Sequence, residues 1–249
     1  MLILSYGITK SGSTLAFELA KGILTSAGYE QPRLPDRVVT SGHNINFIER
    51  ANAATLGALI ETIGPDRRIV VKCHCRFDLK LLDRIEAWIA AGDLQIHAAY
   101  RDPREICLSL LDAGERARAA NRKEFSEIET LDKAIRVCRR QIDTFTRWAM
   151  INGALVLFYN DVAFDFETTI SRMAEHLGVE PDRDAVRTYA FEQAFTQKNK
   201  AVLDRYKDDL TVRENERLLE TFGGFIRFAC EQPIEPWLAK RRAHLLSLL

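Results

Sequence analysis

The stretch that decides the fold spans residues 2–14 and reads LILSYGITKSGST. Its first residues are mostly apolar, as in a buried strand of a parallel sheet. A turn with Gly7, Gly12 and several hydroxyl side chains follows, and the pattern then predicts a helix over Ser11–Ala27 that Gly28 ends. A strand, a glycine-containing turn and a helix in this order predict the first βα unit of an α/β fold.

Further apolar runs of strand length alternate with segments of helical periodicity along the chain. Strands are predicted at Ile69–Val71, Leu94–Tyr100 and Ala154–Tyr159. Helices are predicted at Ile45–Ile63, Leu79–Ala91, Glu124–Ile151, Phe166–Leu177 and Thr211–Cys230, and one more begins at Pro103. We expect an α/β fold with three layers, in which helices flank a mainly parallel sheet, with a P-loop-like first turn and a helical C-terminal portion. No linker or repeat divides the sequence, so residues 1–249 are predicted to form a single domain.

The composition excludes several classes of protein. The 249 residues are 47% hydrophobic and 28% charged, which is typical of a globular protein and not of a disordered one. Lys plus Arg and Asp plus Glu both number 35, and zero net charge argues against a general binder of nucleic acid or anionic membranes. The five cysteines lack CxxC spacing, and no segment has the length of a membrane span or the pattern of a signal peptide. We therefore expect a soluble, cytoplasmic protein with reduced thiols.

The first turn is a candidate anion-binding site. Gly7 and Gly12 have the spacing of the nucleotide-binding P-loop, but Ser13 stands where that motif has its lysine, and a lysine appears instead at position 10. The turn still offers backbone N–H groups, hydroxyls and a helix N-terminus. Without the usual lysine, ATP is a weaker candidate than another phosphorylated ligand. A plain helix start with favourable capping residues is the structural alternative.

A second candidate site follows the strand at Leu94–Tyr100, where residues 101–109 read RDPREICLS. Arg101 at the strand end could bind a phosphate through two hydrogen bonds, or could form a salt bridge with Asp102. Ser109 lies two helical turns further on, where it would be an ordinary solvated residue if it faced outward. Each residue alone is more often structural than functional.

Together these segments resemble the sulfotransferase family that uses 3′-phosphoadenosine 5′-phosphosulfate (PAPS). The family's 5′-phosphosulfate loop has the form P-K-S-G-[ST]-[ST], which residues 10–14 match, with Thr9 where proline is frequent. Its 3′-phosphate motif has the form R-[ND]-P-x-[DE]-x-x-x-S, which is matched from Arg101 to Ser109. The resemblance implies that the nucleotide is bound by Lys10, Ser11, Gly12, Ser13, Thr14, Arg101 and Ser109.

Three further segments extend the resemblance. Residues 71–74, VKCH, are similar to the family's strand that ends in the catalytic histidine, and residues 157–161, LFYND, are similar to L-x-Y-E-D, which adds Tyr159 to the implied nucleotide contacts. The family's late R-K-G-x-x-G-D-W segment is matched only loosely by Asn199–Tyr206, which lacks both glycines and the first arginine. In that alignment Lys200 would serve the 3′-phosphate, and Tyr206 would replace the tryptophan.

The resemblance implies transfer of a sulfuryl group from PAPS to a hydroxyl or amine of a small molecule or carbohydrate, with 3′,5′-bisphosphoadenosine (PAP) as product. His74 would be the general base, because its ordinary pKa lies near neutrality. Lys10 would stabilise charge on the departing phosphate, and Lys72, two residues before His74 on the same face of the strand, would contact the sulfuryl group. No metal is required by this scheme.

Two alternatives remain open from the sequence. One is a small-molecule kinase with a divergent P-loop, which would bind Mg·ATP rather than PAP. The other is a catalytically silent nucleotide-binding protein of the same fold, since the C-terminal motif is altered. The acceptor is not readable, although three loops are candidates to contact it, at residues 33–44, which include His43, at residues 76–80 and at residues 113–125.

Overall fold

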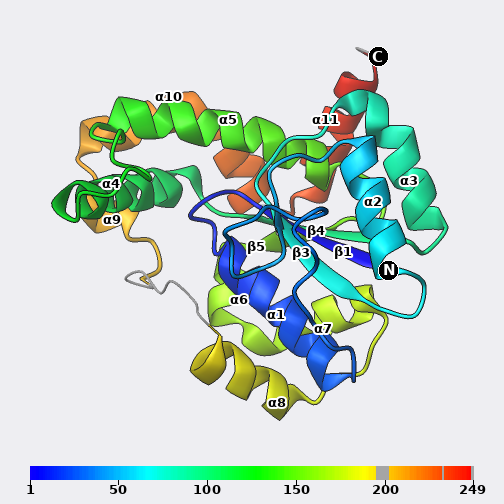
Figure 1. Ribbon diagram of the computed structural model, residues 1–249. Helices are drawn as coiled ribbons and strands as arrows, with labels where there is room; N and C mark the ends of the chain where they lie inside the picture. The colour runs from blue at the N-terminus through cyan, green and yellow to red at the C-terminus, as the bar shows by residue number, and fades with distance from the viewer. Residues whose placement is uncertain (195–201, 232, 248–249) are drawn as a thin grey trace.

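The computed structural model describes residues 1–194, 202–231 and 233–247 (Figure 1). Its sheet contains β1 (Leu2–Gly7), β2 (Phe47–Ile48), β3 (Ile69–Cys73), β4 (Leu94–Tyr100) and β5 (Leu155–Phe158). The strand order is β2-β3-β1-β4-β5, and every neighbouring pair is parallel. The C-terminal ends of β3, β1 and β4 therefore meet at one edge of the sheet, where ligands of open α/β sheets bind.

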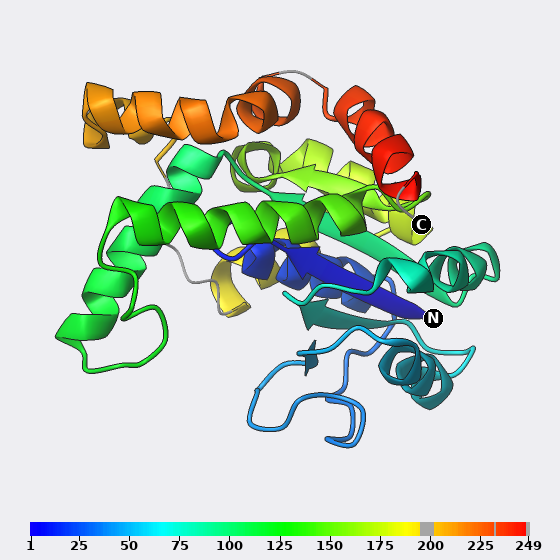
Figure 2. The same ribbon diagram turned by 90° about the horizontal axis from the view of Figure 1, so that it is seen from above.

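Helices cover both faces of this sheet (Figures 1 and 2). One face carries α1 (Ser13–Ser26), α7 (Phe166–Leu177) and α8 (Arg183–Thr188), and the other carries α2 (Ala53–Ile63), α3 (Leu82–Ala90), α5 (Leu131–Ala149) and α11 (Glu235–Leu246). Successive strand residues alternate between the two layers: Ile3 packs with α1, whereas Leu2 and Leu4 pack on the opposite face. This confirms the predicted three-layer α/β architecture.

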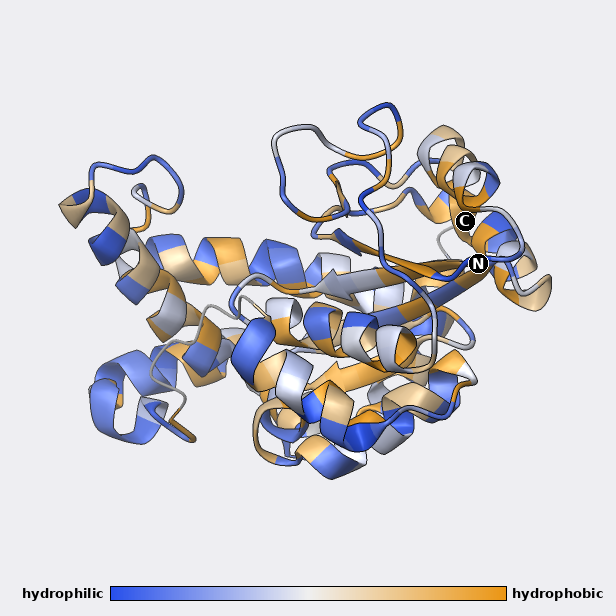
Figure 3. Cartoon of the chain, turned by 60° about the horizontal axis from the view of Figure 1, so that its bottom comes forward, coloured by the Kyte–Doolittle hydropathy of each residue, from blue (hydrophilic) through white to orange (hydrophobic). Residues whose placement is uncertain are grey.

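Seven further elements complete the described fold. They are α4 (Pro103–Ala119), α6 (Tyr159–Phe164), α9 (Tyr206–Asp209), α10 (Val212–Phe225) and the short turns η1 (Leu79–Leu81), η2 (Tyr189–Gln193) and η3 (Ile226–Cys230). The described elements after residue 180 are helical, as predicted. In Figure 3 the helices carry both hydrophobic and hydrophilic residues along their length. Among the described residues, no helix is both long enough and apolar enough to cross a bilayer.

The helix predicted over Ile45–Ile63 begins later than expected. Residues 47 and 48 form β2 beside β3, and α2 starts at Ala53 after Asn52, whose side chain accepts a hydrogen bond from the Thr55 N–H. Ile45 and Ile48 fit the spacing of a helical face, but Ile48 belongs to the sheet itself and its side chain is buried in the core. Such short strands carry too few residues for a period-two pattern to be recognised.

The helix predicted over Glu124–Ile151 also begins later. It starts at Leu131, because the Thr130 hydroxyl accepts a hydrogen bond from the Lys133 N–H and so caps the helix. The residues before it form a loop in which Phe125 has a positive φ of 68°. That loop lies over the candidate site described next.

Candidate functional site

A cavity of about 610 Å³ lies at the C-terminal edge of the sheet. It collects residues from the turns after β1, β3 and β4 and from α6 after β5. Its lining includes Lys10, Gly12, Ser13, Thr14, Lys72, His74, Arg101, Ser109 and Tyr159, together with the apolar or aromatic residues Leu15, Ile45, Phe47, Phe125 and Phe191. The structure thus brings together most of the candidate residues from separate parts of the sequence.

The turn after β1 is shaped to surround an anion. Lys10 and Gly12 both have left-handed backbone conformations, with φ of 72° and 75°, and alternation of this kind turns successive N–H groups toward one concavity. Gly12 occupies the N-cap of α1 and has no side chain, so it leaves the first N–H groups of that helix available to a ligand. Ser11 is buried and supports the turn: its hydroxyl donates to the Ile8 carbonyl at 2.6 Å.

Lys10 brings a positive charge to the cavity in a partly buried setting. Its Nζ lies 5.6 Å from the centre of the Phe125 ring, which covers it. Burial lowers the pKa of Lys10, and the neighbouring charge of Arg116 lowers it further. Desolvation disfavours the charged amine, and an anion bound beside it would stabilise the ammonium form by Coulomb attraction.

His74 follows β3 and is oriented by a hydrogen bond to β1. Its Nδ1 lies 2.7 Å from the Gly7 carbonyl oxygen, and because a carbonyl only accepts, Nδ1 carries the proton. The neutral ring then has its free lone pair on Nε2. Burial lowers the pKa of His74 to about 4, with a smaller contribution from the Lys72 charge. The imidazole is therefore neutral near pH 7, which is the form that a general base needs.

Lys72 lies on β3, next to the turn that follows β1. Its Nζ donates a hydrogen bond to the Thr14 hydroxyl at 2.8 Å, and the residue is only 6% exposed. Burial lowers the pKa of Lys72 to about 8, and the Glu18 carboxylate partly opposes this effect. A buried ammonium group with one neutral partner is suited to contact an anionic group in the cavity.

Arg101, at the end of β4, is held between an acid and an aromatic ring. Its Nη2 donates to Glu105 Oε2 at 2.8 Å, and its guanidinium carbon lies 3.9 Å from the centre of the Tyr159 ring. Its Nε is buried without a hydrogen-bond partner among the described residues. Ser109 lines the same cavity from two turns along α4. An oriented guanidinium with an unsatisfied donor is suited to receive a phosphate.

The late segment lies only partly within the described residues. Lys200 lies outside the described residues. Tyr206, expected near the nucleotide, does not line the large cavity: its ring covers the Arg104 guanidinium at 3.7 Å, and its N–H donates to Glu105 Oε1 at 3.0 Å. It borders a smaller cavity of about 130 Å³ on the other side of Arg101.

Sequence reasoning did not single out Phe47, and it included Phe125 only as the last residue of a candidate acceptor loop at residues 113–125. Phe47 packs between two histidines, with ring centres 4.7 Å from His43 and 5.9 Å from His74, so the loop at residues 33–44 does reach the site. No sequence signal distinguishes these phenylalanines from core residues. Within the described part of the chain, no group of three or more His, Cys, Asp or Glu side chains is placed to hold a metal ion.

Comparison with known proteins identifies the fold. No protein-family model matches the sequence, and no curated protein does either. Among solved structures, mouse sulfotransferase SULT7A1 complexed with PAP is 15% identical, with a TM-score of 0.57, and the match covers 96% of this chain and 88% of that one. Retinol dehydratase in complex with androsterone and the inactive cofactor PAP is 14% identical, with a TM-score of 0.51. This match covers 90% of this chain and 80% of that one. The chain therefore has the α/β fold of the PAPS sulfotransferases.

Proposed function

We propose that this protein is a sulfotransferase that moves a sulfuryl group from PAPS to a hydroxyl or amine of a small molecule or carbohydrate. The fold alone does not imply the reaction, because one fold hosts many chemistries. The observation that carries the proposal is one cavity of about 610 Å³ that is lined by the turn after β1, by the buried cationic side chains of Lys72 and Arg101 and by the neutral His74.

The residues of the cavity fit a nucleotide with phosphate groups at two positions. The turn at residues 8–12 and Lys10 supply donors and positive charge at one position. Arg101 and Ser109 supply them at the other, where the buried Nε of Arg101 has no partner among the described residues. The Tyr159 ring packs against Gly12 and Arg101 and so lies between the two positions, where it can contact an adenosine. When bound, PAPS would supply the sulfuryl group and leave as PAP.

The side chains around the transferred group have distinct tasks. His74 Nε2 accepts the proton of the attacking hydroxyl, while the Gly7 carbonyl holds the ring through Nδ1. Lys72 stabilises negative charge on the sulfuryl oxygens, and Lys10 with the N–H groups of the turn stabilises charge on the departing phosphate oxygen. Phe47 and Phe125 give this part of the cavity an apolar lining, which would limit the access of water to the reacting groups.

Two measurements test the proposal. Calorimetry should detect PAP binding in preference to Mg·ATP, and incubation with sulfur-labelled PAPS should transfer label to members of an acceptor panel of phenols, alcohols, amines and saccharides. Binding of Mg·ATP without affinity for PAP would support a kinase instead. Binding of PAP without transfer to any acceptor would indicate a silent nucleotide-binding protein.

A further inference from the structure

The turn after β1 has a strained conformation that other parts of the fold must hold. Lys10 is not a glycine, yet its φ is 72°, a left-handed backbone conformation that a side chain disfavours. Such conformations persist only where surrounding contacts impose them. On the sheet side, the Ile8 N–H donates to the Ala99 carbonyl at 3.1 Å. The Ser11 hydroxyl donates to the Ile8 carbonyl at 2.6 Å and lies 3.2 Å from the Ala99 carbonyl oxygen.

A contact from the opposite layer completes this support. The Thr9 N–H, directly before Lys10, donates to the side-chain Oε1 of Gln141 at 2.8 Å. Gln141 lies on α5, which covers the face of the sheet opposite α1 (Figure 1). Its own backbone carbonyl accepts a hydrogen bond from the Tyr6 hydroxyl at 3.3 Å, so the glutamine is fixed relative to β1.

We propose that Gln141 is a positioning residue of the nucleotide site, which orders the turn at residues 8–12 through the Thr9 N–H before the ligand binds. The effect on PAPS or PAP rests on the function proposed above, whereas the ordering of the turn does not. Gln141 lines no part of the cavity, so its influence on the ligand passes through the backbone of the turn.

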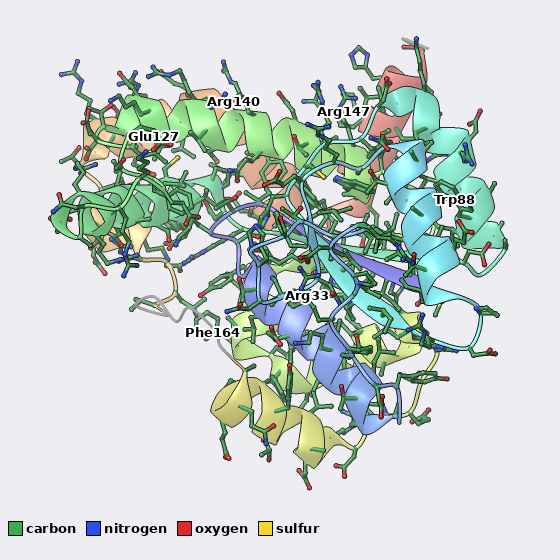
Figure 4. All side chains as sticks on the ribbon, viewed as in Figure 1. Arg33, Trp88, Glu127, Arg140, Arg147 and Phe164 are labelled. Carbon is green, nitrogen blue, oxygen red and sulfur yellow. The ribbon has the colours of Figure 1, made fainter. Side chains whose placement is uncertain are left out.

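The rest of α5 is held independently of this contact. Cys138, Phe145 and Trp148 are fully buried in the core, and the Trp148 indole N–H donates to the Cys75 carbonyl at 2.8 Å. Arg140, the residue before Gln141, points away from the sheet (Figure 4). Loss of the Gln141 acceptor should therefore loosen the turn and leave the helix in place.

Hydrogen exchange of the protein without ligand tests the ordering directly. Gln141→Met preserves the length of the side chain and removes the acceptor, so amides of residues 9–12 should exchange about tenfold faster, as expected for the loss of one hydrogen bond. Gln141→Glu keeps an acceptor and should retain the slow exchange. The matched control is Thr144→Ala, because the Thr144 hydroxyl donates only within α5, to the Arg140 carbonyl, and its loss should not affect the turn.

Calorimetry then connects the turn to the ligand. Gln141→Met should weaken PAP binding about five- to tenfold, while Thr144→Ala should leave it unchanged. If the wild-type protein does not bind PAP, the proposed function fails, and exchange alone decides the role of Gln141. Two results would overturn the inference: an unprotected Thr9 amide in the wild type, or equal protection of the turn in the wild type and Gln141→Met. The first result needs only the wild-type protein, so it can refute the inference even if the variant does not fold.

Discussion

Gly12→Ala should damage the nucleotide site for two separable reasons. The first is the backbone, because Gly12 has a φ of 75° and a left-handed residue with a Cβ costs about 1–2 kcal/mol. The second is space: a Cβ at this position would lie 2.7 Å from Cδ2 and 3.0 Å from Cε2 of Tyr159. The ring would have to move, and it is stacked on the guanidinium of Arg101.

Gly28→Ala provides a matched control. Gly28 also has a positive φ, 89°, but a Cβ added there meets no described atom within 4 Å. It should lower the free energy of unfolding by the backbone cost alone, about 1–2 kcal/mol. Gly12→Ala adds an overpacking cost, for a total of about 2–5 kcal/mol.

Urea denaturation and calorimetry with PAP measure the two effects. Gly28→Ala should bind PAP like the wild type, whereas Gly12→Ala should bind at least about tenfold more weakly, because the displaced Tyr159 ring no longer orients Arg101. If the two variants lost equal stability and both kept wild-type affinity, the Tyr159 ring would be free to move, and the argument from close packing would be wrong.

Three further substitutions separate binding from catalysis. Arg101→Ala should weaken PAP binding by about 2–4 kcal/mol, because a charge-assisted contact to the 3′-phosphate is lost. It should weaken the binding of adenosine 5′-phosphosulfate, which lacks that phosphate, far less. Equal losses in calorimetry would show that Arg101 does not contact the 3′-phosphate. His74→Ala should leave PAP affinity nearly unchanged and lower kcat by at least about 10²; near wild-type transfer in single-turnover assays would assign the proton to another base. The pKa of His74 is about 4, so kcat/KM for the nucleotide should fall as the pH drops through about 4, where His74 becomes protonated. The pKa of Lys72 is about 8, so kcat/KM should also fall as the pH rises through about 8, where Lys72 loses its charge. Lys72→Arg stays charged and should abolish the basic limb; a limb that persists would belong to another group.

The sequence predicts the position of a candidate site residue where that residue closely follows a strand. Lys10, His74 and Arg101 each follow an apolar run, and parallel strands bring such positions to one edge of the sheet. The short motifs around these residues are sufficient to indicate the resemblance to the PAPS sulfotransferases, and the fold comparison supports that resemblance. Their individual roles stay predictions.

The remaining parts of the site depend on tertiary contacts that leave no local pattern. Gln141 lies in an amphipathic helix among other polar residues, and only the packing of α5 on the sheet places it beside Thr9. Phe125 was assigned to a helix, because nothing in its neighbours signals a left-handed conformation. Phe47 belongs to a strand of two residues, which is too short to show alternation.

The central place of β1 has a consequence for how the protein acquires its site. β1 pairs with β3 and β4, whose registers join Leu2 to Ile69 and to Leu94, so both pairings close long stretches of chain. Contacts between residues so distant in sequence form late and slowly in folding, because the entropy of closing the chain is lost before they form. During synthesis, the first turn emerges long before the strands that flank it. Recovery of PAP binding during refolding should therefore lag behind the appearance of helical structure, and a fragment that ends before β4 should not bind the nucleotide.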